Sequence, residues 1–403
     1  DNNENKVLNV PHLRFPEFTE EWKETKLGKI AEITKGSGIS KDQLSEQGSP
    51  CILYGELYTK YKSEIINEVY SRTELDSSLL VKSKANDVII PCSGETAIDI
   101  STARCVPFNN ILLGGDLNII RLKNNDGGFF AYQLNGTRKK DIARVAQGVS
   151  VVHLYGENLK HIRVYHPAIE EQKKITRLLS LIDKRIATQN KIIYKLKSLI
   201  RGIMVELQKR GLSNGTWKKV LLSNVLTERN ELNKSLYPVY SVSVIQGIVN
   251  QMEYLGRSFA ASDTSKYHVV HYGDLVYTKS PTGSFPYGII KQSYNQNEVA
   301  VSPLYGVYEP KTFSTGVFLH EYFKSELNTL NYLHPLVQKG AKNTINIANQ
   351  RFLESYVAIP SNANELLAIS KLLCSLNTKL EFLQNILKQS QGQKQYLLRQ
   401  MFI

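Results

Sequence analysis

The sequence predicts an α+β protein made of two tandem mixed domains, each followed by a long helix, with an internal two-fold relationship between the copies. Three observations support this: two heptad-patterned stretches near residues 170 and 364, similar segments ahead of each, and a chain of 403 residues. That length accommodates two domains of ordinary size, each with its own core. No stretch reaches the ~20 apolar residues that a membrane span requires, and the polar start is unlike a signal peptide.

The first long helix is predicted over residues 167–212. Pro167 stands where proline is tolerated before a helix, and Gly211 marks the expected end. Only Gln189 interrupts the apolar seam, and this sustained 3.5-residue repeat indicates a coiled coil. The seam residues of this helix are Ile175, Leu179, Ile182, Ile186, Ile193, Leu196, Ile200, Ile203 and Leu207.

The second long helix is predicted over residues 361–403. Its seam falters at Ser390 and Gly392 before Leu397 and Met401 resume the repeat. Two ordinary amphipathic core helices are the alternative, but the sustained period favours two long helices packed on each other. The seam residues of this helix are Ile369, Leu373, Leu376, Leu380, Leu383 and Leu387.

The segments ahead of the two helices also match. "EWKETKLGKI" (21–30) resembles "TWKKVLLSNV" (216–225), and both copies then carry a tight turn at Asp87 or Asp274 followed by a β-rich run. We therefore expect an N-terminal segment (1–20), a first domain (21–166) and a second domain (213–360). Within the domains the sequence predicts helical stretches at 128–148 and 316–340, strands at 51–58, 87–92 and 117–122, and one or two strands in 237–249.

The sequence contains no recognisable catalytic constellation. Adjacent prolines are absent, Pro91-Cys92 lacks a cofactor loop ahead of it, and there is no Walker P-loop. A Glu-x-Lys pattern occurs at Glu171-Gln172-Lys173, but it lies at the helix start, where charges usually face solvent. The eight histidines do not combine with cysteine at zinc-ligand spacing. We therefore expect a protein that is not an enzyme and that has no catalytic residue, metal or cofactor of its own.

Charge and cysteine content point toward a polyanionic partner and a reducing compartment. The net charge of +13 favours nucleic acid through counterion release, although charge alone is also compatible with a solvated basic surface. The four cysteines form no CxxC pair or disulfide framework, so we expect reduced thiols and a cytoplasmic location.

Loops that combine basic, hydroxyl, amide and aromatic side chains are the candidate binding surface, because such groups read base edges in DNA grooves. Any one of these loops could be a plain surface loop, but their recurrence in both copies favours a role in binding. The candidate DNA-binding residues are Lys35, Ser37, Tyr54, Glu56, Tyr58, Lys60, Lys62, Ser93, Thr96 and Arg104 in the first domain, and Ser241, Gln246, Lys279, Ser280, Thr282, Ser284, Lys342 and Asn343 in the second.

Taken together, these features resemble the specificity subunit of type I restriction-modification enzymes. The family's "P-x-x-E-Q-x-x-I" phrase stands here as residues 167–175, with one extra residue after Pro167, and the second copy keeps Pro360, Glu365 and Ile369 but lacks the Glu-Gln pair. Residues 10–30 and 397–403 also look like the family's two ends. The resemblance covers nearly the whole chain.

The resemblance implies that each domain is a target recognition domain that reads one half of a bipartite site in double-stranded DNA. The two helices would form an antiparallel coiled coil that spaces the domains and docks two methyltransferase (modification) subunits. Two restriction (translocase and endonuclease) subunits would complete the complex, and S-adenosylmethionine, ATP and magnesium would belong to these partners. A coiled-coil scaffold or adaptor whose domains bind proteins is the alternative.

The predicted helix length fits such a spacing role. Residues 175–209 would rise roughly 50 Å at ~1.5 Å each. This exceeds one DNA turn of ~34–36 Å, so half-sites about 10–15 base pairs apart are within reach.

Overall fold

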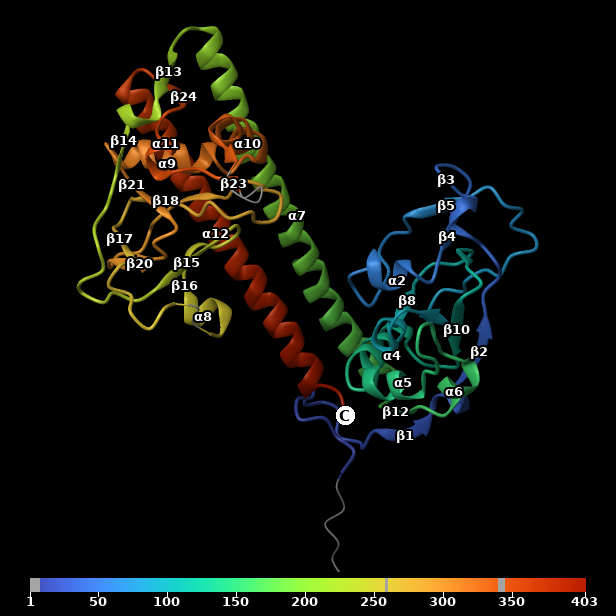
Figure 1. Cartoon of the computed structure of the whole chain (residues 1–403). Coiled ribbons are helices and arrows are strands. Elements are labelled where there is room, and N and C mark those ends of the chain that lie inside the picture. The colour runs from blue at the N-terminus through green and yellow to red at the C-terminus, as the bar shows by residue number, and fades with distance from the viewer. Residues whose placement is uncertain (1–7, 258–259, 340–344) are drawn as a thin grey trace, which may run out of the picture. The chain divides into compact units, whose positions relative to one another are not determined.

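A computed structural model describes residues 8–257, 260–339 and 345–403 (Figure 1). Its contacts divide the chain into a first unit, residues 1–190 with 385–403, and a second unit, residues 191–384. Helices α7 (Ile169–Ser213) and α12 (Ala363–Gln400) each contribute residues to both units. No helix in the described part of the chain is long and apolar enough to span a membrane.

The first unit alternates short strands with short helices ahead of α7. Its strands are β1 (Lys23–Lys26), β2 (Ala31–Lys35), β3 (Leu44–Ser45), β4 (Ser49–Ile52), β5 (Ser71–Thr73), β6 (Asp87–Pro91), β7 (Ser93–Gly94), β8 (Arg104–Val106), β9 (Leu112–Leu113), β10 (Leu117–Leu122), β11 (Val152–His153) and β12 (Arg163–His166). Its helices before α7 are α1 (Leu27–Ile30), the 3-10 turn η1 (Lys41–Gln43), α2 (Glu56–Thr59), α3 (Ala97–Ile100), α4 (Gly127–Asn135), α5 (Lys139–Val145) and α6 (Gly156–Lys160).

An antiparallel sheet of order β2-β10-β6-β8 forms the centre of the first unit. Side chains alternate between its faces, so Val88 and Ile90 join a core with α4 and α7, whereas Ile89 joins a separate core on the other face. The predicted strands at 87–92 and 117–122 are confirmed. The predicted strand at 51–58 is wrong beyond Ile52, because the chain turns at Tyr54 and Gly55 into helix α2, and the Glu56 carboxylate accepts the Leu53 backbone N–H (3.1 Å) across this turn.

The second unit follows the same plan. Its strands are β13 (Trp217–Leu221), β14 (Leu226–Glu228), β15 (Tyr240–Ser243), β16 (Gly247–Asn250), β17 (His268–Val270), β18 (Leu275–Tyr277), β19 (Ile290–Gln292), β20 (Val299–Val301), β21 (Gly306–Pro310), β22 (Gln338–Lys339), β23 (Ile345–Asn346) and β24 (Tyr356–Pro360). Its helices before α12 are η2 (Leu222–Asn224), α8 (Gln251–Leu255), α9 (Phe313–Tyr322), α10 (Glu326–Leu333), η3 (His334–Leu336) and α11 (Asn349–Phe352).

The central sheet of the second unit, β14-β21-β18-β19, is the counterpart of the first sheet. Its residues also alternate between two cores, with Leu275 and Tyr277 facing α9 and α12 and Val276 facing the β15–β16 hairpin. This hairpin confirms the strands expected in 237–249.

The helical stretch predicted at 128–148 breaks into two helices. The stretch predicted at 316–340 overlaps α9 and contains α10 and η3, but its end is wrong, because Gln338 and Lys339 form strand β22. In the first unit α4 ends at Asn135 and α5 begins at Lys139, and in the second α9 ends at Tyr322. Ser325 then caps α10 by accepting the backbone N–H of Asn328. The sequence pattern gave the right type of structure but missed these local caps.

A matched aspartate–arginine pair supports the turn predicted at Asp87 and Asp274. Asp87 accepts the backbone N–H of Lys84 and pairs with Arg121 from β10 at 2.9 and 2.7 Å. Asp274 is likewise buried and pairs with Arg229, which follows β14, at 2.8 and 3.3 Å. The turn aspartates therefore bind a neighbouring strand rather than a ligand.

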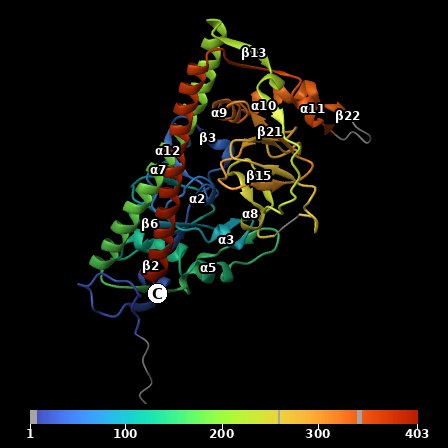
Figure 2. The ribbon, with the colours of Figure 1, turned by 90° about the vertical axis from the view of Figure 1, so that its left-hand side faces the viewer.

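Helices α7 and α12 lie side by side and run in opposite directions in both units (Figure 2). The early part of α7 shares a core with the end of α12 in the first unit, and the late part of α7 shares a core with the start of α12 in the second. Every predicted seam residue of both helices is buried or half-buried, so the heptad pattern located the packed face.

Two details of the helix prediction need correction. Gly211 lies inside α7, which continues to Ser213, and a Cβ there would come within 2.2 Å of the Trp217 ring. The seam of α12 does not fail at Ser390, because the helix is continuous and Ser390 and Lys394 occupy buried seam positions. Glycine at 211 thus allows a close approach, and the polar seam residues have partners in the first unit.

Candidate DNA interface

The candidate loops of the first unit emerge at one end of its central sheet. At this end β2 and β6 finish while β10 and β8 begin, as the pairs Lys35–Asn118, Pro91–Leu117 and Ile89–Arg104 require. The loop after β2 and the loop between β6 and β8 therefore leave the sheet together. Tertiary structure thus brings together two sequence segments that lie about 60 residues apart.

Lys35 ends strand β2, and Ser37 lies in the loop that follows it. Lys35 is exposed, whereas the Ser37 hydroxyl accepts the Val81 backbone N–H at 2.8 Å. Ser37 also forms a parallel bridge with Gly114, whose N–H bonds to the Ile52 carbonyl at 2.9 Å. This bridge brings the segment around α2 to the same end of the sheet.

Tyr54, Tyr58, Lys60 and Lys62 surround helix α2. The Tyr58 hydroxyl lies 3.6 Å from the position that a Cβ would take on Gly94, which joins this segment to the β6–β8 loop. Burial raises the pKa of Tyr58, with a further contribution from nearby Tyr54 and acidic groups, so its hydroxyl keeps its proton. Tyr58 is half-buried and can act as both donor and acceptor toward a ligand.

Glu56 and Arg104 are not available to a ligand in this structure, contrary to expectation. Glu56 is buried and bonds to Lys60 Nζ (2.6 Å) and to the Ser71 hydroxyl. Arg104 is buried and donates to the carbonyls of Leu57 (3.0 Å) and Tyr61 (2.8 Å). Both side chains hold the segment around α2 in place through these hydrogen bonds. The sequence alone does not reveal this role, because Glu and Arg are usually exposed.

Ser93 and Thr96 begin the β6–β8 loop. Ser93 is half-buried in β7, which pairs with β11. Thr96 is exposed and caps α3, accepting the Asp99 N–H at 3.1 Å and donating to the Asp99 carboxylate at 2.6 Å. Five of the ten first-domain candidates therefore lie in segments at or next to one end of the sheet: Lys35, Ser37, Tyr58, Ser93 and Thr96.

A buried charge cluster lies beneath this region. Lys394 of α12 bonds to Glu64 and to Asp183 of α7, both at 2.6 Å, and Asp183 also accepts the Tyr132 hydroxyl at 2.7 Å. Burial raises the pKa of Glu64, while the two carboxylates raise that of Lys394 against the effect of its own burial. The cluster joins both long helices to the domain that precedes α7 in the first unit.

In the second unit the equivalent end of the sheet carries the β18–β19 loop, residues 278–289. Lys279 has a positive φ of 62° and is half-buried, and burial lowers its pKa while Glu228 opposes this shift. Ser280 and Ser284 are exposed, and Ser284 bonds to Glu326. Thr282 is half-buried and exchanges two backbone hydrogen bonds with Phe285, both 3.0 Å, which fix a tight turn.

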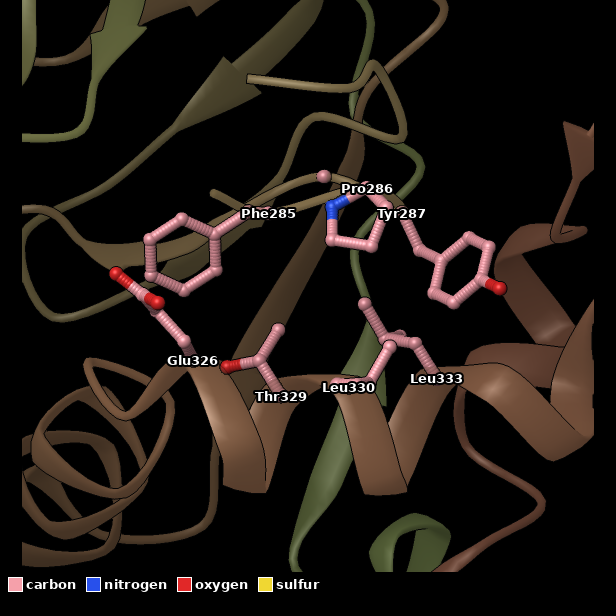
Figure 3. Close-up of a pocket in the computed structure, with 8 residues that line it drawn as sticks. Phe285, Pro286, Tyr287, Glu326, Thr329, Leu330 and Leu333 are labelled. Atoms are coloured by element: carbon pink, nitrogen blue, oxygen red, sulfur yellow. The ribbon is translucent and has the colours of Figure 1, made fainter. Parts of the chain in front are cut away.

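Helix α10 supports this loop from below. Phe285, Pro286 and Tyr287 lie over a row formed by Glu326, Thr329, Leu330 and Leu333 (Figure 3). The contact leaves no room for a small ligand between loop and helix. The loop therefore presents its polar tip outward on a packed apolar base.

The remaining second-domain candidates do not all join this loop. Ser241 is half-buried in β15 and accepts from Gln251 at 3.0 Å, whereas Gln246 is exposed at the turn of the β15–β16 hairpin. Both residues belong to the β15–β16 hairpin rather than to the β18–β19 loop. Lys342 and Asn343 lie outside the described residues.

The Glu171-Gln172-Lys173 pattern has a structural role. Glu171 is buried rather than solvent-facing, and it accepts two hydrogen bonds from Arg14, both 2.8 Å, and one from Trp22 Nε1 at 3.4 Å. Glu171 is thus fully occupied in joining the N-terminal segment to α7. Within the described residues no group of His, Cys, Asp and Glu is arranged to hold a metal ion.

The hairpin of residues 147–153 also lies at the loop end of the first sheet, and it is not among the candidate binding segments that the sequence predicts. Residues 147–153 form a small hairpin, in which Gln147 and His153 exchange backbone hydrogen bonds of 2.9 and 2.7 Å. Gly148, followed by the β-branched "VSVV", is a turn-and-strand signal that could have identified it. Its strand β11 pairs with β7 and so lies beside Ser93.

Comparisons with known proteins agree with this architecture. Residues 19–198 match the family model described as "Type I restriction modification DNA specificity domain". The chain is similar to the crystal structure of a type I restriction-modification S subunit from M. genitalium, with a TM-score of 0.64 and 15% identity over 98% of this chain and 99% of that one.

Two further solved structures are more distantly similar. An HsdS subunit from Thermoanaerobacter tengcongensis matches with a TM-score of 0.36 and 13% identity over 94% of each chain. A chain from a study of complex assembly and conformational transition of the type I R-M system matches with a TM-score of 0.44 and 11% identity, over 96% of this chain and 98% of that one.

Proposed function

We propose that the chain belongs to the type I restriction-modification DNA specificity family and that it selects a bipartite DNA target for such a complex. Residues 19–198 match the model of the type I restriction modification DNA specificity domain, and the chain is similar in fold to a type I S subunit. Each recognition domain reads one half-site, and helices α7 and α12 set the distance between the half-sites. Specificity then resides in the loops at one end of each central sheet.

The observation that carries this proposal is that both units have candidate binding loops at the same end of their central sheet. In both units a four-stranded antiparallel sheet directs polar and aromatic loops to one end. In both, a tryptophan at the start of the domain, Trp22 just before β1 or Trp217 in β13, bonds to a glutamate near the start of a long helix. Two similar DNA-binding domains, joined by two antiparallel helices, can each bind one of two separated sites on the same duplex. The net charge of +13 suits a phosphate backbone.

The long helices also offer surfaces for partner subunits. In the first unit Leu181 of α7 and Tyr396 of α12 are more than half exposed. In the second unit Leu199 and Val205 of α7 and Phe382 of α12 are more than half exposed as well. Exposed apolar groups on a helix favour protein contacts, so we assign one methyltransferase subunit to the helix pair of each unit.

Chemistry is assigned to those partners. Two modification subunits would supply methylation with S-adenosylmethionine, and two restriction subunits would supply translocation and cleavage with ATP and magnesium. The chain itself would contribute binding and geometry in the cytoplasm, without a catalytic group or a cofactor of its own.

A binding measurement tests the proposal. The target is first identified as the sequence methylated in the host genome, and the affinity of the chain with its modification subunits is then measured on target and scrambled duplexes over a salt series. We expect affinity to fall with salt on both duplexes, with a clear preference for the target at every salt concentration. Equal affinity for both duplexes would support the scaffold alternative instead.

A further inference from the structure

We propose that the hairpin of residues 147–153 is a base-reading element, in which Val149 and Val151 contact the 5-methyl group of a thymine in the first half-site. This inference rests on the proposed DNA-specificity function. It assigns a specificity-determining role to two apolar residues outside the basic and polar loops.

The position of the hairpin supports this role. Strand β7 continues outward from the end of β6, and β11 runs antiparallel to it, with Val152 opposite Gly94 and His153 opposite Ser93. Residues 148–151 therefore lie farther from the sheet than Gly94. The tip projects from the loop end of the sheet, beyond Ser93.

The base of the hairpin is firmly held. The Leu154 N–H donates to the Cys92 carbonyl at 2.7 Å, and the buried Asn118 side chain donates to the Leu154 carbonyl at 2.9 Å. Gly148 has a φ of +119°, and a Cβ there would come within 2.1 Å of the Val151 carbonyl oxygen. Glycine thus permits the turn, and hydrogen bonds to Cys92, which follows β6, and to Asn118 of β10 hold its base, so the tip has a defined position.

The tip carries apolar groups that the fold itself does not use. Val149 is 95% exposed, the highest value among the large hydrophobic side chains of the described residues, and Val151 is 53% exposed. Their side chains do not belong to any core of the first unit. Both valines are therefore available to contact a ligand.

The apolar character of Val149 and Val151 indicates which group on DNA they contact. The thymine methyl is the apolar group displayed on base edges in the major groove. Side chains that wedge between base steps are longer, such as Phe, Leu, Ile, Met or Pro, so short valines suit an edge contact better. A protein partner needs roughly 800 Å² from each side, far more than two valine tips supply. Continuity with the Ser93 and Tyr58 loops places the tip at the same ligand.

The test combines a protein change with a DNA change. The chain, in complex with its modification subunits, carries Val149→Ser, Val151→Ser or neither, and binds target duplexes in which each thymine of the first half-site is replaced in turn by deoxyuridine. This replacement removes only the methyl group. We expect the unmodified chain to lose about three- to tenfold in affinity at one thymine, because a buried methyl group contributes on that scale.

The variants should abolish this discrimination. Val149→Ser is expected to bind the thymine and deoxyuridine duplexes equally, whereas Val10→Ser, on the N-terminal segment, keeps the difference. Thermal unfolding should be unchanged by Val149→Ser, since the side chain is exposed. A first half-site with no A·T pair, or full discrimination retained by both hairpin variants, would overturn the inference. Loss of all target preference in the unmodified complex would instead refute the proposed function.

Discussion

The indole Nε1 of Trp217 donates to the Glu365 carboxylate at 2.8 Å, and this bond joins the first strand of the second unit to the start of α12. Trp22 makes the same connection to Glu171 at the start of α7, at 3.4 Å. The two pairs identify Glu365 as the structural counterpart of Glu171, although the second copy lacks the Glu-Gln phrase. They differ in one respect, because Glu171 also binds Arg14.

This difference predicts unequal effects of the same substitution. Glu171→Gln should destabilise the first unit by roughly 3–5 kcal/mol, because it leaves the Arg14 guanidinium without its carboxylate partner in a largely buried site. Glu365→Gln should cost about 1 kcal/mol or less in the second unit, because an amide oxygen still accepts the indole N–H. Urea unfolding followed by the single remaining tryptophan, in Trp217→Phe and Trp22→Phe backgrounds, separates the units. Equal losses would contradict the assignment of Arg14.

The buried lysine of α12 predicts a large and rescuable effect. Lys394→Met removes the shared cation from Glu64 and Asp183, and should cost about 3–5 kcal/mol because two carboxylates remain buried without it. Adding Glu64→Gln and Asp183→Asn to the same chain should restore much of the loss. Ser390→Ala, one seam position earlier, is the matched control and should cost about 1 kcal/mol. A triple variant as unstable as Lys394→Met would contradict the electrostatic explanation.

A buried histidine predicts acid sensitivity of the second unit. Burial, together with Lys324 and Lys291, holds the pKa of His320 well below its usual value, and its Nδ1 accepts the Gln292 N–H at 2.8 Å. The unfolded chain binds a proton near pH 6.5 while the folded chain does not, so stability should fall as pH drops below about 6.5.

Substitution of this histidine should flatten that pH dependence. His320→Asn retains an acceptor for Gln292 but cannot titrate, so its unfolding free energy should change less between pH 7.5 and pH 5.5. Trp217 fluorescence in a Trp22→Phe background reports on the relevant unit. An unchanged slope would show that other groups govern the acid response.

Recognition should be divided between the domains. Lys35→Ala or Tyr58→Phe is expected to weaken discrimination in one half-site, and Lys279→Ala or Ser280→Ala in the other, by ~1–3 kcal/mol where a base edge is lost. Binding to duplexes altered in one half-site at a time gives the measurement. Lys123→Ala and Lys311→Ala, on exposed lysines that follow the opposite ends of β10 and β21, are the controls. A first-domain variant that relaxed both half-sites equally would contradict divided recognition.

The length of helices α7 and α12 should set the distance between the two half-sites. Inserting one heptad after Gln189 in α7 and one after Leu383 in α12 keeps the seam in phase, and both positions lie at the boundary between the units. Seven residues add roughly 10 Å, or about three base pairs at ~3.4 Å each. Methylome sequencing of cells that carry the variant should reveal unchanged half-sites with a longer gap. An unchanged gap with retained activity would mean that the helices do not set the spacing.

The sequence by itself determined the repeat, the long helices and their packed faces. A heptad is a local, periodic signal, so Ile175, Leu179 and Leu373 could be assigned to a buried seam before any contact was known. Strands 87–92 and 117–122 were also readable, because both are short apolar runs between turn signals. These features depend on residues that are close in sequence. The two similar copies also show the same pattern twice, which supports each prediction.

Only the tertiary structure decided which polar residues face outward. Arg104 and Lys394 have the side chains of surface residues, yet both are buried, because their partners come from distant segments. The same long-range pairing of β2, β10, β6 and β8 collected separate loops at one end of the sheet and projected the 147–153 hairpin beyond them. A charged side chain is buried only where the fold places a hydrogen-bonding or oppositely charged partner next to it. The order of the strands determines which residues become neighbours in this way.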